Sequence, residues 1–250
     1  MEVTTIGLLG VGLLIILLAM GVPIAFAMAA VGLGGIWILE GPSAAMAHVT
    51  LVSWSEGQSF VLVTIPLFIL MGQLVFYTGL ASDLYSTVHK WIGRVPGGIA
   101  ITSVLACGGF GAVTGSSIAT VATMGSVVMP EMRRYNYDAA LATGSLAASG
   151  TLGILIPPSL IFIFYGVMTE SSIGALFMAG VVPGVLVAVM FSLIILLRCL
   201  LRPELGPRGP SVGWGVRFRS LTGLVPILTL FVLVIGGIYA GLFTPTEAAG

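Results

Sequence analysis

Residues 98–130, GIAITSVLACGGFGAVTGSSIATVATMGSVVMP, form an apolar stretch that is long enough to cross a membrane but poorly suited to a single helix. Its middle holds four glycines, at 108, 109, 111 and 115, together with Thr114, Ser116 and Ser117. Non-helical backbone is tolerated at membrane depth only where protein or a water-filled cavity satisfies its polar groups. We therefore predict a re-entrant helical hairpin that turns at its Gly-Ser-Ser tip and leaves on the side it entered.

The composition of the chain places this hairpin in a lipid bilayer. Of the 250 residues, 58% are hydrophobic and 7% are charged, whereas soluble domains carry about 25% charged residues. The two cysteines are too few for a disulfide framework. No basic cluster lies on a soluble face, so nucleic acid is excluded as a partner. The composition thus predicts an all-α polytopic membrane protein.

Six other apolar segments are predicted to span the membrane, since a spanning helix needs about 20 residues. They cover about 6–20, 22–39, 60–78, 139–168, 174–197 and 221–242. Gly21 and Pro23 separate the first two. Residues 79–97 instead have apolar side chains at helical spacing, which predicts an amphipathic helix at the membrane surface. These apolar positions are Leu80, Leu84, Val88 and Trp91.

All nine Lys and Arg residues fall in three segments, 79–97, 131–138 and 198–219. Short cytoplasmic loops are enriched in these residues. If the N-terminus is periplasmic and residues 98–130 form a hairpin, all three segments lie on the cytoplasmic side. The loops 40–58 and 169–173, which lack Lys and Arg, then share the opposite side. A single crossing by 98–130 would separate the basic segments, so the charge distribution favours the hairpin.

A re-entrant tip brings the end of one half-helix beside the start of another. The ending half points carbonyl oxygens at the tip, a partial negative charge that suits a cation. The starting half points free N–H groups at it, which suits a carboxylate. Either Ser116 or Ser117 is expected to cap the second half, and the other hydroxyl then remains for a ligand. The tip is therefore a predicted binding site.

A second interruption, SGTLGILIPPS, lies inside the predicted span 139–168. Its two glycines weaken the helix, and Pro157 cannot make the normal backbone hydrogen bond within it. The following Pro-Ser pair, residues 158–159, is expected to open the next half-helix. The span is therefore predicted to be a broken helix.

Two discontinuous helical elements in one chain are typical of secondary transporters with a site near the membrane midplane. The six predicted spans contain no Asp, Glu, Lys, Arg or His, whereas a proton-coupled carrier usually keeps such a residue inside. Coupling would then use hydroxyl and carbonyl oxygens, which suit a hard cation such as Na⁺. We expect no other metal and no cofactor.

Three alternatives remain open at this point. The glycines could serve only close helix packing, as in the G-x-x-x-G at 111–115. An intramembrane hydrolase could use Ser116 or Ser117 as its nucleophile, but it needs a partnered base. Both His48 and His89 lie outside the spans, so no catalytic residue is predicted. A membrane scaffold or assembly subunit would have no transport site of its own.

Several motifs resemble those of the large membrane (permease) subunit of TRAP transporters (tripartite ATP-independent periplasmic), the DctM-like family. They are GVPIAFAM at 21–28, IPLFILMG at 65–72, TGSSIATVATMG at 114–125, MPEMRRYNYD at 129–138, SGTLGILIPPSLIFI at 149–163 and LFTPTEAAG at 242–250. The resemblance runs the whole length of the chain, and the SGTLGILIPPS stretch is its most specific part.

The resemblance implies a Na⁺-driven elevator-type importer of an organic anion, such as a C4-dicarboxylate or sialic acid, in the bacterial inner membrane. It implies two partners, a small membrane subunit and a periplasmic substrate-binding protein. The sodium-binding residues would be Thr114, Gly115, Ser116, Ser117, Gly150, Thr151 and Pro157. The substrate-binding residues would be Ser116, Ser117, Pro158 and Ser159.

The resemblance also divides the chain into regions. They are scaffold spans (1–78), an interfacial arm helix (79–97), a transport region (98–200) with the hairpin 98–130 and the broken helix 139–168, a cytoplasmic Arg/Pro-rich loop (201–219), a linking span (220–243) and the start of a second half (244–250). The family is built from two inverted halves, but this sequence has one hairpin and one broken helix. Residues 244–247, Thr-Pro-Thr-Glu, match a capping box, which predicts the start of a new helix. We therefore expect a truncated sequence that holds the first half of an inverted-repeat transporter.

Overall fold

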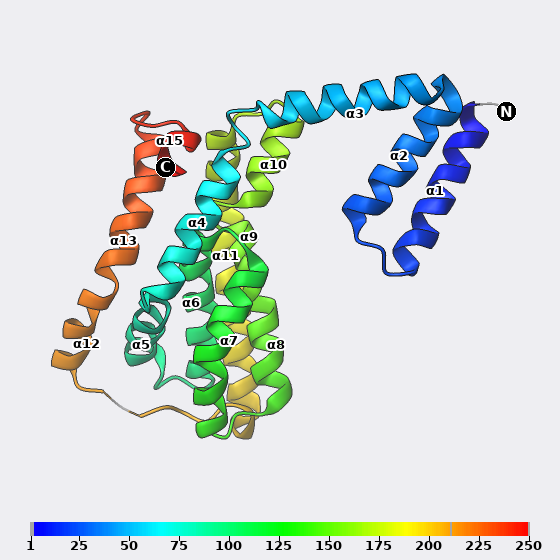
Figure 1. Cartoon of the computed structure of the whole chain (residues 1–250). Helices are drawn as coiled ribbons and strands as arrows, with labels where there is room; N and C mark the ends of the chain where they lie inside the picture. Colours follow the sequence, from blue (N-terminus) through cyan, green and yellow to red (C-terminus); the bar gives the residue numbers. More distant parts are fainter. Residues whose placement is uncertain (1–2, 211, 250) are drawn as a thin grey trace. The chain divides into compact units, whose positions relative to one another are not determined.

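The computed structural model describes residues 3–210 and 212–249, and every regular element among them is helical (Figure 1). The chain divides into two compact units, Met1–Ser59 and Phe60–Gly250. The predicted all-α fold is therefore confirmed.

The first unit consists of α1 (Val3–Ala19), α2 (Ile24–Glu40) and α3 (Pro42–Gly57). The turn between α1 and α2 uses Gly21, whose φ of +82° favours glycine, and Pro23 precedes α2 as predicted. The described part of α1 has no buried residue, and Leu8 is 71% exposed. Such outward-facing apolar side chains fit a lipid environment or another protein surface.

The second unit contains the remaining helices. They are α4 (Thr64–Tyr77), α5 (Leu80–Ile92), α6 (Gly98–Thr114), α7 (Ser117–Arg134), α8 (Ala139–Gly150), α9 (Leu152–Leu155), α10 (Leu160–Met168), α11 (Ile173–Leu201), α12 (Trp214–Ser220), α13 (Val225–Phe231), α14 (Gly237–Tyr239) and α15 (Pro245–Ala249). Two 3₁₀ turns, η1 (Pro203–Leu205) and η2 (Leu221–Gly223), and a π-helical segment, η3 (Val232–Gly236), complete the unit.

Helix α6 forms the centre of this unit. All but two of its 17 residues are buried, because α5, α7, α8 and α11 all pack against it. Its glycines allow this packing: a Cβ at Gly111 would lie 2.5 Å from the Cα of Gly153 in α9. This close approach shows that Gly111 serves helix packing.

Helices α6 and α7 form the predicted helical hairpin, with their turn at residues 115–116. One boundary was wrong: α7 continues through Pro130 to Arg134, whereas residues 131–134 were expected in a loop. The two arginines at its end lie in the last helical turn, where cations interact favourably with the helix dipole.

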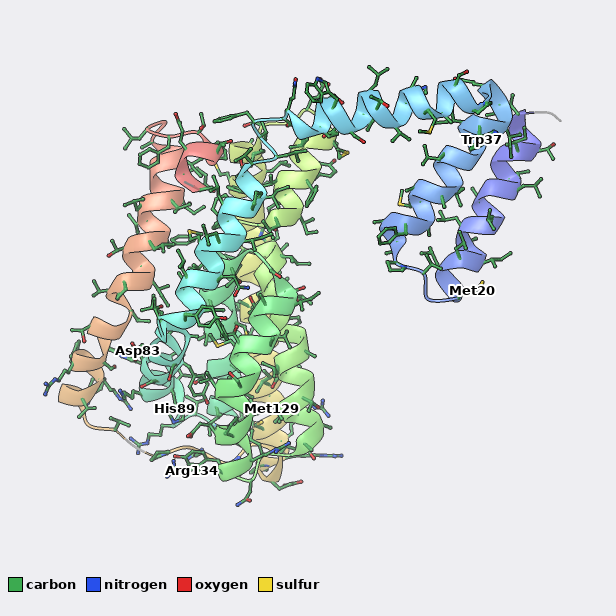
Figure 2. The ribbon with its side chains drawn as sticks, viewed as in Figure 1. Met20, Trp37, Asp83, His89, Met129 and Arg134 are labelled. Carbon is green, nitrogen blue, oxygen red and sulfur yellow. The ribbon has the colours of Figure 1, made fainter. Side chains whose placement is uncertain are left out.

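The three basic segments meet at one end of the unit, near the residue labelled Arg134 in Figure 2. Gly97 N donates to Gly206 O (3.0 Å), and Gly209 N donates to Gly93 O (2.8 Å). Tyr137 Oη donates to Pro207 O (3.0 Å) and accepts from Ile99 N (3.1 Å). Burial raises the pKa of Tyr137 to about 12, so the phenol keeps the proton that it donates. The three basic segments therefore contact one another, as a shared side requires, and their cytoplasmic placement stays a prediction.

Most of the helices are too short to cross a membrane alone. Among the described residues, α11 alone is long and apolar enough to cross a membrane. Three bent pairs reach that length together: α4 with α5 (65°), α8–α9 with α10 (43°), and the α12–η2 segment with the α13–α14 segment (46°). Helices α1, α2 and α6 are shorter apolar helices. The bends arise at the Gly and Pro positions, where a straight helix is interrupted.

Helix α5 confirms the amphipathic helix predicted for 79–97, but its buried face differs. The fully buried residues are Ala81, Leu84, Tyr85 and Thr87, while Leu80, Val88 and Trp91 are only half-buried. The difference arises because α5 is covered from two sides, by α6 and by α12 with η2.

The expected capping box is present at the start of α15. Thr244 N donates to Glu247 Oε2 (2.8 Å), and Glu247 N donates to Thr244 Oγ1 (3.3 Å). The hydrogen bonds that Thr244 N and Thr244 Oγ1 donate to the carboxylate lower the pKa of Glu247. A buried hydrogen bond between Thr64 Oγ1 and Thr246 Oγ1 (2.8 Å) then ties α15 to α4.

Candidate functional site

The tip of the hairpin is a two-residue break between α6 and α7. Gly115 has a φ of +61°, which favours glycine, and its N–H donates to Gly111 O (2.8 Å). Ser116 is extended, and its Oγ caps α7 by accepting from Ala119 N (3.4 Å). Within residues 3–210 and 212–249, Ser117 Oγ forms no hydrogen bond. The prediction that one serine caps and the other hydroxyl stays available is thus confirmed, with Ser116 as the cap.

The second break separates α9 from α10. Ile156 and Ser159 have extended backbones at its two ends, and Pro157 and Pro158 are buried between them. The expected opening of the half-helix at Pro158 and Ser159 is confirmed in position, because Ser159 is the N-cap residue directly before Leu160. Its side chain does not cap α10, since Ser159 Oγ donates back to Ile154 O (2.6 Å).

The two breaks lie directly against each other. Leu160 N, at the start of α10, donates to Gly115 O at the tip (3.3 Å). A Cβ at Gly115 would lie 2.9 Å from Pro158 O, and one at Gly153 would lie 2.9 Å from Ser116 O. Glycine is therefore required at both positions for the backbones to come this close.

Oxygen atoms gather where the breaks meet. The hydroxyls of Thr114 and Thr120 are hydrogen-bonded to each other (2.9 Å), and both residues are buried. Thr120 Oγ1 would lie 2.8 Å from a Cβ at Gly153, on the same side as Ser116 O. Hydroxyl and carbonyl oxygens are the donors that hard cations prefer. The arrangement can therefore offer several neutral oxygens to a small cation.

Gly150 and Thr151, which were also predicted to bind sodium, lie in different surroundings. Gly150 is buried against Val121 and the carbonyl of Ser117, and a Cβ there would clash with the Val121 side chain. Thr151 is exposed, and its hydroxyl donates to Ala148 O (2.7 Å) within its own helix rather than to the tip. Gly150 thus approaches the tip from α8, whereas the bonding of Thr151 is local.

A cavity of about 360 Å³ lies beside the tip, on the side that faces α4. Thr114 and Ser116 line it from the hairpin, and Thr123 lines it from the next turns of α7. Gln73 and Phe76 line it from α4. None of the lining residues is ionisable, so electrostatic complementarity here must come from backbone dipoles and neutral polar groups. Ser117, Pro158 and Ser159, predicted to bind substrate, are not among the lining residues.

Sequence reasoning missed three polar residues of this site. Thr120 and Thr123 lie one and two turns into α7, on the faces turned toward the second break and the cavity. Their spacing from Ser116 was a usable signal, because residues three and four apart share a helix face. Gln73 lies on α4, which was assigned to the scaffold, and only the fold brings it to the tip: a Cβ at Gly72 would lie 3.2 Å from the Cα of Thr114.

Comparison with known proteins agrees with this architecture. Residues 11–250 match the family described as "Tripartite ATP-independent periplasmic transporter, DctM component". The C4-dicarboxylate TRAP transporter large permease protein DctM of Vibrio cholerae is 39% identical over 100% of this chain and 53% of its own length. The ectoine TRAP transporter large permease protein TeaC of Halomonas elongata is 34% identical over 93% of this chain and 54% of its own length.

A third relative combines components in its name. The isethionate TRAP transporter permease protein DctMQ of Oleidesulfovibrio alaskensis is 34% identical over 95% of this chain, which covers 37% of the relative. The chain spans about half the length of the first two relatives. All three are named as transporter permease proteins rather than enzymes.

Proposed function

This chain belongs to the family of the DctM component of tripartite ATP-independent periplasmic transporters, and on that premise we propose that its two helix breaks form part of a Na⁺-coupled site for importing a small organic anion. The permease would lie in the bacterial inner membrane, with the N-terminus periplasmic and the basic segments cytoplasmic. That orientation is supported by the confinement of all nine Lys and Arg residues to three segments that contact one another.

The observation that carries the proposal is the direct contact between the hairpin tip and the second break. Thr114, Thr120 and the carbonyl of Ser116 supply neutral oxygens there. The free Ser117 hydroxyl can add its oxygen to this cation site or donate its proton to the substrate, and the first N–H groups of α7 are donors that suit an anionic substrate. A cation bound among the oxygens would in turn attract the carboxylate or sulfonate of a substrate.

The substrate is proposed only as a class. The relatives are named for C4-dicarboxylate, ectoine and isethionate, so their names do not favour one compound. By family membership, the partners would be a small membrane subunit and a periplasmic substrate-binding protein. The name DctMQ in one relative is consistent with such a second membrane component.

The proposal is tested with the complete transporter that contains this chain, reconstituted in proteoliposomes with its binding protein. Radiolabelled succinate, ectoine and isethionate are offered with and without an inward Na⁺ gradient. We expect Ser116→Ala with Ser117→Ala to weaken Na⁺-dependent uptake by about ten-fold, because one helix cap and one free hydroxyl are lost. The matched control is Ser126→Ala with Ser192→Ala, whose hydroxyls bond to backbone carbonyls of their own helices.

Two outcomes would contradict the proposal. If uptake by the parent protein does not depend on the Na⁺ gradient, Na⁺ is not the coupling ion. Identical uptake by the tip variant and the control variant would favour a scaffold or assembly role without a transport site in this chain.

A further inference from the structure

A second polar pocket lies where α5 contacts α12 and η2, and none of its lining residues belongs to the hairpin. Its volume is about 430 Å³, and it shares no lining residue with the cavity beside the tip. Charged and hydroxyl-bearing side chains dominate its lining: Asp83, Ser86, Thr87, Lys90, Arg219 and Thr222. Asp83 is labelled on α5 in Figure 2. Nothing in the proposed transport chemistry uses this pocket.

The walls of the pocket are held together by specific contacts. The buried Thr87 hydroxyl lies 2.9 Å from Ser220 O and 2.8 Å from Asp83 O, and its single proton is shared between the two carbonyls. A Cβ at Gly223 would lie 3.1 Å from Thr87 Oγ1, so η2 approaches α5 closely. The turn from α12 into η2 is therefore held against α5, and these contacts define the walls of the pocket.

Two cations in this pocket lack an acidic partner. Within the described parts of the chain, neither Lys90 nor Arg219 has a carboxylate within 4 Å. Asp83 supplies the single negative charge of the lining. Two cations with neighbouring hydroxyls match the oxygens of a phosphate group. Asp83, in turn, can accept hydrogen bonds from hydroxyl groups of the same ligand.

The surroundings of the pocket indicate a lipid rather than a soluble phosphate. Trp214 and Phe218 of α12 are 66% and 60% exposed, and Arg217 lies over the Trp214 ring at 5.0 Å. Phe218 also meets Trp91 of α5 edge-on, at 5.6 Å between ring centroids. Exposed aromatic rings interleaved with arginines are typical of the headgroup level of a membrane.

We propose that this pocket binds the headgroup of phosphatidylglycerol, with Lys90 and Arg219 contacting its phosphate. Ser86 and Thr222 donate further hydrogen bonds to the phosphate, and Asp83 accepts from the glycerol hydroxyls. Trp214 and Phe218 pack against the acyl chains. The bound lipid anchors α5 and α12 to the leaflet on the basic side, where anionic lipids attract such residues. This inference does not depend on the transported substrate.

The first test measures lipid binding to the complete transporter by native mass spectrometry. Phosphatidylglycerol and phosphatidylcholine are titrated against the parent, against Lys90→Gln with Arg219→Gln, and against a matched control. The control, Arg133→Gln with Arg202→Gln, removes two exposed arginines from the same end. Each cation near the phosphate is worth about 1 kcal/mol, so the pocket variant should lose about thirty-fold in phosphatidylglycerol affinity. Lys90→Arg with Arg219→Lys keeps both charges and should bind as the parent does.

The second test uses the fact that Lys90 is the only lysine among these 250 residues. In nanodiscs containing phosphatidylglycerol, Lys90 should be acetylated at least several-fold more slowly than in phosphatidylcholine nanodiscs. Inorganic phosphate added to the phosphatidylcholine nanodiscs should give no protection. Equal lipid affinity of the pocket and control variants would overturn the proposal. Protection by inorganic phosphate as strong as that by phosphatidylglycerol would overturn it as well, since the site would then serve a soluble anion.

Discussion

The two helix breaks of the second unit contain similar residues but are built differently. At the tip, Ser116 caps α7 and Ser117 keeps a free hydroxyl. At the second break, Ser159 bonds back to Ile154 O, and two buried prolines complete the interruption. The tip thus leaves the Ser117 hydroxyl available, whereas the Ser159 hydroxyl is hydrogen-bonded within its own break. If the proposed site is correct, this difference predicts ligand contact at the tip and support from the second break.

The largest expected effect comes from separating the two breaks. In Gly153→Ala, the new methyl group would meet the backbone oxygen of Ser116 at 2.9 Å and Thr120 Oγ1 at 2.8 Å. Because the backbone of Ser116 cannot rotate away as a side chain can, the tip must move. We expect Na⁺-dependent uptake to fall by more than about ten-fold, with a stability loss of about 1–3 kcal/mol.

Gly144→Ala in the preceding helix is the control for this change. A Cβ at Gly144 meets no atom within 4 Å, and alanine in a helix interior is slightly stabilising. Uptake in proteoliposomes and thermal unfolding are measured for both variants. If Gly153→Ala transports as well as Gly144→Ala, contact between the breaks is not needed for transport.

A smaller effect is expected from restoring a continuous helix at the second break. Replacing Pro157 and Pro158 with alanine supplies the missing N–H groups and lets α9 and α10 join. We expect uptake to fall by about ten-fold or less, because the support under the tip changes while Ser116 and Ser117 remain. Binding of the periplasmic partner, measured by co-purification, should be unaffected. Uptake equal to that of the parent would reject a role for the break.

The smallest effects separate ligand contact from support. Ser117→Ala removes a hydroxyl that has no hydrogen bond in the described residues, so stability should change by less than about 0.5 kcal/mol. The Na⁺ concentration for half-maximal uptake should rise several-fold. Ser159→Ala removes a buried hydrogen bond and should cost about 1 kcal/mol of stability, with unchanged Na⁺ dependence. Thermal unfolding and Na⁺ titration of uptake measure both. If Ser117→Ala instead lowers stability and Ser159→Ala changes the Na⁺ dependence, then ligand contact belongs to the second break and support to the tip.

Much of the fold could be predicted because its signals are local. The glycine-rich tip, the Gly21 turn and the capping box at 244–247 were each found from a few adjacent residues, since backbone conformation and capping act over one helical turn. The grouping of the basic segments followed from charge alone. Helix ends were less predictable: α7 passes through Pro130, and the Ser159 side chain does not cap α10, because tertiary contacts and side-chain bonding decide such details.

The composition and the order of its apolar, glycine-rich and basic segments determined that this chain is an all-α membrane protein with one hairpin and one broken helix. Those properties depend on local backbone preferences and on the cost of placing charge in lipid. Only the tertiary structure decided which polar groups meet. It placed Thr120 and Gln73 at the tip, bonded the Thr151 hydroxyl to a carbonyl of its own helix, and brought Lys90 and Arg219 into the lining of one pocket. These contacts depend on how closely separate helices approach each other. Glycines at the helix crossings allow the close approach, but which helices cross there is decided by the packing of the whole unit.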